Sequence, residues 1–136
     1  MPADLPIVLV PGLGSSVRNH LAILPTLWRH GSVFVANQTR DNTIAAMAKR
    51  VLSEAPEKFS VIGHSLGGYI VLEMIRQAPE RIVRLALLNT SARPDTPASR
   101  AVRNERIAET KAGRYAEMQE KNFPRESRSS FIMIIC

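Results

Sequence analysis

The chain has 136 residues, of which 45% are hydrophobic and 22% charged, so it can build one hydrophobic core and is neither disordered nor collagenous. Its net charge is +6, but the basic residues are spread along the whole sequence and no RNA-binding or helix-turn-helix motif occurs, which argues against a nucleic-acid partner. The single cysteine, Cys136, excludes a disulfide framework and a cysteine-based zinc site within the chain.

Nothing in the sequence predicts secretion or membrane insertion. Residues 1–5 are not basic, and the apolar run Ile7–Val10 stops at Pro11, which is too short for a signal peptide. No apolar stretch approaches the roughly 18–20 residues that a membrane helix requires. We therefore expect a protein of the cytoplasm that has no membrane partner and keeps its cysteine reduced.

Over residues 1–91, short β-branched runs alternate with helical patterns, which predicts βαβ units and a parallel sheet. We expect helices over 19–29, from Asp41 or Thr43 to a point before Pro56, and over 69–77. The expected strands are 7–10, 32–36, 59–62 and 82–88. These elements predict the α/β class, with a mostly parallel sheet of about four strands and flanking helices.

Beyond Asn89 the pattern changes. A polar loop, residues 90–99, precedes a mainly helical stretch from about 100 to 121 that has few apolar positions. Such a helix suits a surface or lid element better than another crossover between strands. The segment 124–130 is polar, and 131–136 is an abrupt apolar end.

The sequence Gly63-His64-Ser65-Leu66-Gly67 directly follows the third expected strand and opens a helix. A nucleophilic serine at so tight a strand-to-helix turn sits in strained backbone with its hydroxyl exposed, and the flanking glycines let the strand and helix pack closely. The pattern therefore predicts a nucleophile elbow with Ser65 as the nucleophile. The other interpretation is an ordinary glycine-rich turn between a strand and a helix.

The loop after the first strand, residues 10–16, is the candidate for a second catalytic element. Acyl transfer creates an oxyanion, and each well-placed backbone N–H lowers the barrier by about 3 kcal/mol. We expect the N–H groups of Leu66 and Leu13 to be these donors. The alternative, a phosphate-binding loop, has little support, because Val17 stands where a dinucleotide fingerprint needs glycine and no Gly-Lys-Ser/Thr follows.

Three segments, 8–12, 63–68 and 81–91, resemble the α/β-hydrolase superfamily, in particular its small cap-bearing esterases, lactonases and acyltransferase-like members. The resemblance covers roughly residues 5–120, although Pro11 stands where many relatives have histidine. It implies a partial α/β-hydrolase fold, with Ser65 as nucleophile and Leu13 and Leu66 as oxyanion donors. It also implies that the helical stretch after Arg100 begins a cap over the acyl pocket.

On this resemblance we divide the chain into three parts: an α/β core at 1–99, a partial helical cap at 100–123, and an irregular tail at 124–136. Six apolar residues at a free terminus are an aggregation liability. We therefore interpret the tail as a candidate non-native segment, as a truncated or frame-shifted gene product would carry.

The remaining members of a catalytic triad are missing from the expected places. In this superfamily the nucleophile is followed by an acid and then a histidine, but no histidine follows Ser65. We interpret His64 as structural, His30 as a helix-end residue, and His20 as a candidate for a catalytic or substrate contact. Asp95 is a candidate acid, although its proline neighbours suit a turn. The spacing of these residues predicts no metal site.

The sequence thus predicts the first part of a cofactor-free serine hydrolase. By resemblance it acts by hydrolysis or acyl transfer on a small ester, lactone or thioester. Without a general base we expect it to be weakly active or inactive alone. The alternative is a non-catalytic protein of the same fold that binds a small apolar ligand or pairs with a subunit, including itself, through an exposed sheet edge.

Overall fold

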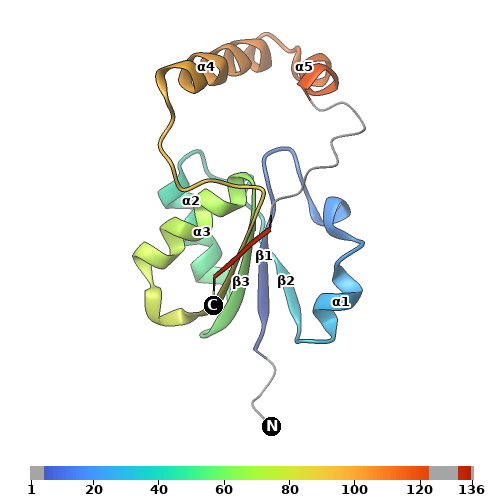
Figure 1. The fold of residues 1–136 in the computed structure, drawn as a ribbon, viewed down its shortest axis with the longest axis vertical. Coiled ribbons are helices and arrows are strands. Elements are labelled where there is room, and N and C mark those ends of the chain that lie inside the picture. Colours follow the sequence, from blue (N-terminus) through green and yellow to red (C-terminus); the bar gives the residue numbers. More distant parts are fainter. Residues whose placement is uncertain (1–4, 123–131, 136) are drawn as a thin grey trace. The chain divides into compact units, whose positions relative to one another are not determined.

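The computed structural model describes residues 5–122 and 132–135 (Figure 1). These residues fall into two compact units: one holds residues 5–92 and 132–135, and the other holds residues 93–122. The division after Ala92 comes before the predicted boundary at residue 99, because the loop that leads to the first helix of the second unit groups with that unit.

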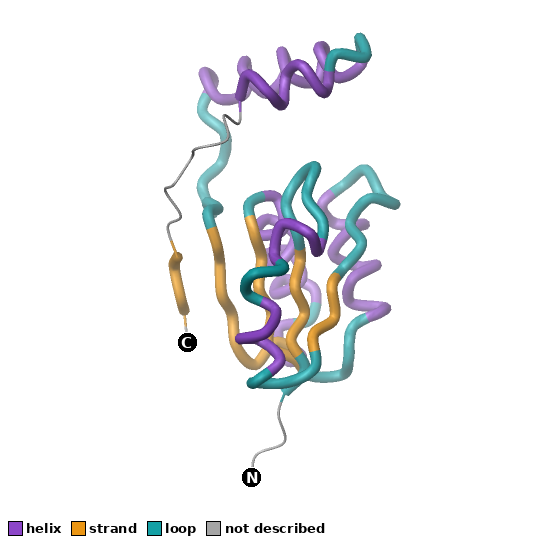
Figure 2. Tube along the Cα trace, turned by 90° about the vertical axis from the view of Figure 1, so that its right-hand side faces the viewer, coloured by secondary structure: helices purple, strands orange, loops and turns teal. Residues whose placement is uncertain are grey.

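A five-stranded sheet in the order β2-β1-β3-β4-β5 forms the centre of the first unit (Figure 2). Four strands are parallel, as predicted: β1 (Ile7–Val10), β2 (Val33–Val35), β3 (Phe59–His64) and β4 (Ile82–Leu88). The fifth, β5 (Ile132–Ile135), pairs antiparallel with β4. The predicted irregular tail is therefore wrong for 132–135, where an apolar β-branched run pairs with a strand edge; residues 124–131 and 136 lie outside the described residues.

Helices cover both faces of this sheet. Figures 1 and 2 show α2 (Ile44–Glu54) and α3 (Leu66–Gln77) on one face and α1 (Leu24–Trp28) on the other. The predicted helix over 19–29 is wrong in extent, because two short elements replace it: a 3-10 turn, η1 (Val17–His20), and α1. Pro25 lacks an N–H, so it is accommodated in the first turn of α1 and not inside a longer helix.

The hydrophobic core lies where α2 and α3 pack on the sheet. All four residues of β1 are buried, as expected for a strand covered on both faces. From α3 the core receives Ile70, Val71 and Met74, all fully buried. Each such side chain stabilises the fold by about 1.5–3 kcal/mol when buried. The carboxyl ends of the parallel strands are thereby fixed relative to one another.

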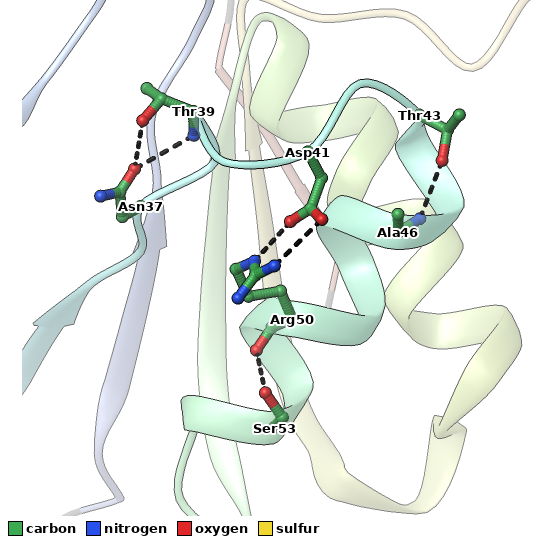
Figure 3. A network of polar contacts seen from close by, with 7 residues as sticks. All are labelled: Asn37, Thr39, Asp41, Thr43, Ala46, Arg50 and Ser53. Carbon is green, nitrogen blue, oxygen red and sulfur yellow. Dashed lines mark hydrogen bonds and ion pairs between the residues drawn. The ribbon is translucent and has the colours of Figure 1, made fainter.

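The start of α2 shows which of the two candidate caps, Asp41 or Thr43, begins the helix. Thr43 is the N-cap, since its hydroxyl accepts a hydrogen bond from the Ala46 N–H at 3.2 Å (Figure 3). Asp41 instead forms a two-contact ion pair with Arg50 on the helix. The Arg50 guanidinium lowers the pKa of Asp41, so this tie between the loop and α2 persists in mild acid.

Arg81, in the short 3-10 turn η2 (Pro79–Arg81), holds the connection between α2 and β3. Its guanidinium lies over the ring of Phe59, 5.7 Å from the ring centroid. It also donates hydrogen bonds of 2.7–3.1 Å to four backbone carbonyls, those of Leu52, Ala55, Pro56 and Glu57. One permanently charged side chain thus satisfies the carbonyls of an entire turn.

The second unit contains α4 (Pro97–Lys111) and α5 (Tyr115–Asn122). The residues whose burial is known in this unit are all exposed or half-buried. Its contacts include the Thr96 cap of α4 and surface ion pairs, such as that between Glu109 and Arg114 at 2.6 Å. Within the described ranges no helix combines the length and apolarity needed to cross a membrane.

Candidate active site

Ser65 occupies the single-residue turn between β3 and α3, as the sequence predicts. Its backbone angles are φ 52° and ψ −115°, in a region that side-chain-bearing residues rarely adopt. Holding a residue there costs about 1–3 kcal/mol, which the surrounding structure must supply. The conformation places Ser65 at the N-terminus of α3, directly beyond the carboxyl end of β3.

Glycines around Ser65 make this turn possible. A β-carbon on Gly67 would lie 2.0 Å from the carbonyl oxygen of Val10, and one on Gly63 would lie 2.8 Å from the carbonyl oxygen of Gly67. Both distances are too short for any side chain. The first turn of α3 therefore packs directly on the backbone of β1, which explains the glycines of the motif physically.

The end of β4 anchors the strained turn from its other side. The N–H of Ser65 donates to the carbonyl of Leu88 at 3.0 Å, and the hydroxyl of Thr90 donates to the carbonyl of Ser65 at 2.7 Å. A β-carbon on Gly68 would lie 2.3 Å from the Thr90 hydroxyl oxygen. Sequence reasoning missed Thr90, because its contact depends on the register between β3 and β4.

The loop after β1 lies against Ser65. A β-carbon on Gly12 would lie 3.1 Å from that of Ser65, and the loop closes in a turn with a hydrogen bond of 3.2 Å from the Ser15 N–H to the Gly12 carbonyl. Gly14 supports the turn with φ 64°. Leu13, at the outer side of the turn, is 71% exposed.

Among the described residues, the two N–H groups predicted as oxyanion donors have no hydrogen-bond partner. Leu66 is the first residue of α3, so its N–H has no carbonyl of the helix to reach. The N–H of Leu13 donates no hydrogen bond to any residue that the structure describes. Both groups are therefore able to donate to a bound ligand.

The side chain of a buried glutamine forms hydrogen bonds with the loop after β1. Gln38, in the segment after β2, is 6% exposed, and its side-chain amide donates to the carbonyls of Pro11 at 3.2 Å and Gly12 at 3.0 Å. Sequence reasoning missed this residue, since a single glutamine in a polar loop carries no signal. The parallel register of β1 and β2 is what brings it to the loop.

Two of the three histidines lie together near this loop. The rings of His20 and His64 meet edge to face, with centroids 5.1 Å apart. His20 is buried, and its Nδ1 lies 3.0 Å from the carbonyl oxygen of Ser16. The Nδ1 of His64 is buried without a hydrogen-bond partner among the described residues. Burial, with a smaller contribution from His20, lowers the pKa of His64, so its ring is neutral near pH 7.

Among the described residues, no histidine or acid forms a hydrogen bond with the hydroxyl of Ser65. Within residues 5–122 and 132–135 that hydroxyl has no hydrogen-bond partner. His30 is exposed beyond the end of α1. Asp95 belongs to the second unit, where both carboxylate oxygens accept hydrogen bonds from Arg103, whose guanidinium lowers the pKa of Asp95.

Two further features of the described chain bear on binding. No group of three potential metal-ligating side chains occurs in the part of the chain that the structure describes. A groove of about 340 Å³ between α4 and α5 includes Val102 and Met118, but most of its lining side chains are charged. The predicted site residues Leu13, Ser65 and Leu66 all lie just beyond the ends of β1 and β3.

Residues 40–131 match the family described as alpha/beta hydrolase fold, which is more than half of the chain. The chain therefore belongs to this family, and the predicted resemblance is confirmed. A sequence relative, the pimeloyl-[acyl-carrier protein] methyl ester esterase of Aromatoleum aromaticum, is 33% identical over 95 residues, which are 67% of this chain and 35% of that protein. The corresponding Klebsiella pneumoniae esterase is 33% identical over 93 residues, 65% of this chain and 34% of that protein.

Solved structures agree with the fold. A marine microorganism esterase superimposes with a TM-score of 0.62 at 22% identity, over 81% of this chain and 48% of that one. A hydrolase from Pseudomonas aeruginosa gives a TM-score of 0.60 at 28% identity, over 82% of this chain and 49% of that one. The chain thus spans about half the length of these structures and about a third of the length of the curated relatives.

Proposed function

We propose that the chain provides the nucleophile and oxyanion-binding part of a serine esterase, which acts in the cytoplasm without a cofactor. The observation that carries the proposal is the strained backbone of Ser65 at the junction of β3 and α3. Because curated relatives are methyl ester esterases for a carrier-bound acyl chain, we propose a small carboxylic ester as substrate, with a methyl ester of such an acyl chain as the leading candidate.

In the proposed reaction the hydroxyl oxygen of Ser65 attacks the carbonyl carbon of the ester. The carbonyl oxygen becomes an oxyanion, which accepts hydrogen bonds from the N–H groups of Leu13 and Leu66 and lies at the positive end of α3. When the tetrahedral intermediate collapses, the bond to the alcohol oxygen breaks. The proton that leaves Ser65 ends on that oxygen or in solvent, and the acyl group stays on Ser65 until water releases it.

Removal of the proton from the Ser65 hydroxyl needs a base, and the described residues place none in hydrogen-bonding contact with it. A serine hydroxyl is a weak nucleophile without an adjacent base, and loss of the base costs about 10⁴–10⁶ in rate. We therefore propose that this chain alone reacts with activated esters, whose leaving groups need no proton, and turns over ordinary esters very slowly.

A fluorophosphonate probe tests the proposal, because it modifies only a nucleophilic serine in a formed site. We expect a single adduct on the wild-type chain and none on Ser65→Ala, located by mass spectrometry of tryptic peptides. Ser53→Ala is the matched control, since Ser53 is an exposed serine on α2 whose hydroxyl donates to the Arg50 carbonyl. Equal labelling of Ser65→Ala, or no labelling of folded wild-type protein, contradicts the proposal.

The second candidate function is association through a sheet edge, and β2 favours it. On its outer side no described strand pairs with β2, which therefore offers unpaired N–H and C=O groups to a second chain. Light scattering over a range of concentrations separates the candidates. The register with β1 leaves the N–H of Val35 on the outer side of β2, so a stable dimer that Val35→Pro dissociates supports pairing, and a monomer at every concentration contradicts it.

A further inference from the structure

We infer that Gln38 is a positioning residue for the oxyanion site: it sets the direction of the Leu13 N–H by holding the carbonyl oxygen of the same peptide group. The inference rests on the proposed function, because it assigns Leu13 as an oxyanion donor. Gln38 lies two residues beyond Ala36, and the role we assign to it is to orient Leu13 and not to contact the ester.

The contact is unusually well built for a loop glutamine. Gln38 is 6% exposed, and its side-chain amide nitrogen donates to Pro11 and Gly12, at 3.2 and 3.0 Å. The Gly12 oxygen also accepts the N–H of Ser15 at 3.2 Å. Two donors therefore fix this one carbonyl, and removing the buried amide would leave it with only the turn contact.

Peptide geometry transmits this restraint to Leu13. The described chain contains no cis peptide bond, and in a trans peptide the carbonyl of one residue and the N–H of the next point in opposite directions. Fixing the Gly12 oxygen toward Gln38 therefore fixes the Leu13 N–H away from it. Gly12 packs against Ser65, so this peptide group borders the nucleophile.

The sequence of the loop explains why an external anchor is needed. Glycine on both sides of Leu13 lets the backbone rotate at little steric cost, and Gly14 already has φ 64°. A rotation of the peptide between Gly12 and Leu13 would turn the donor away while leaving the path of the chain almost unchanged. Gln38 opposes that rotation.

Gln38 is itself held firmly, because its neighbours are tied down (Figure 3). The side-chain oxygen of Asn37 accepts hydrogen bonds from the Thr39 N–H at 3.0 Å and the Thr39 hydroxyl at 2.7 Å. Three residues beyond Gln38, Asp41 is paired with Arg50 on α2. Before it, the N–H of Ala36 donates to the Leu9 carbonyl at 2.9 Å, continuing the pairing of β2 with β1.

The test measures the rate of Ser65 acylation by p-nitrophenyl acetate, followed as the first-turnover release of p-nitrophenol. Gln38→Met keeps the length of the side chain and removes the donor. We expect the limiting acylation rate constant to fall by about 10²–10³-fold, the usual effect of losing one oxyanion donor, with little change in the half-saturating ester concentration. Gln77→Met is the matched control, because Gln77 is an exposed glutamine that bonds Ala45 and Glu73 on the helices, and its rate should match wild type.

Gln38→Glu provides an independent signature. Its carboxylate cannot donate to Gly12 when ionised but can when protonated, so the ratio of its acylation rate to that of wild type should rise as pH falls. A purely structural role would not produce this rescue, and the comparison needs only folded Gln38→Glu protein if Gln38→Met fails to fold.

The outcomes separate the two hypotheses. Wild-type acylation rates in folded Gln38→Met, or a rate ratio for Gln38→Glu that does not rise in acid, overturn the role of Gln38 while Ser65 still reacts. If wild type and Ser65→Ala release p-nitrophenol equally slowly, the proposed function fails, and the inference fails with it.

Discussion

The two units of the chain are stabilised in different ways. Residues 5–92 surround a core of fully buried side chains, whereas those of 93–122 whose burial is known are all exposed or half-buried. The strained residues Ser65 and Asn89 both lie in the first unit, at strand ends. Strained backbone persists only where packing over-determines it, so the unit with the core is the one able to carry a preorganised site.

Glycine-to-alanine exchanges should show this difference most strongly. In Gly67→Ala the new methyl group would lie 2.0 Å from the Val10 carbonyl oxygen, so we expect a loss of about 3 kcal/mol or more in unfolding free energy. In Gly113→Ala nothing lies within 4 Å, and only the strain at φ 80° remains, about 1–2 kcal/mol. Urea denaturation followed by circular dichroism measures both. Equal losses would mean that the first turn of α3 can move off β1.

Truncation of an apolar side chain should give the next largest difference in unfolding free energy between the two units. Met74→Ala empties a fully buried position and should cost about 2–5 kcal/mol. Val102→Ala changes a side chain of α4 that is 48% exposed and should change stability by less than about 0.5 kcal/mol. The same denaturation experiment applies. A large effect at Val102 would show that the second unit contributes to a shared core.

Lowering the pH should reduce the stability of the first unit more than that of the second, by less than either kind of substitution above. Because the pKa of His64 is lowered on folding, the unfolded chain binds the proton more tightly. The contribution of the neutral His64 ring to the unfolding free energy is therefore complete above the ordinary histidine pKa of 6.5. It declines as pH falls below 6.5 and levels off below the pKa of His64 in the folded state. Asp95 and Glu109 in the second unit have lowered pKa values, so their ion pairs persist over this range.

The measurement is the unfolding free energy at pH 7.5 and 5.5 for wild type and His64→Gln. We expect a smaller loss in the variant, because the histidine that resists protonation is gone. The same loss in both proteins would assign the acid sensitivity to another group.

Local sequence signals were sufficient for the strands and for the position of Ser65. β-branched runs predicted β1 to β4, and the glycine spacing placed the turn between β3 and α3. Contacts that depend on register between strands could not be predicted, which is why Thr90 and Gln38 were missed. The pairing of 132–135 with β4 was missed for the same reason. The catalytic roles of Ser65, Leu66 and Leu13 stay predictions.

The hydrogen bonds of Arg81 also decide where a protease can cut. Trypsin must draw several residues into an extended conformation, and around the exposed Lys58 this would break contacts between the guanidinium and up to four carbonyls. Lys111 lies at the end of α4 beside the turn at Gly113, in a unit whose residues of known burial are all exposed or half-buried. Trypsin should therefore separate the two helices of the second unit well before it nicks the first unit at Lys58.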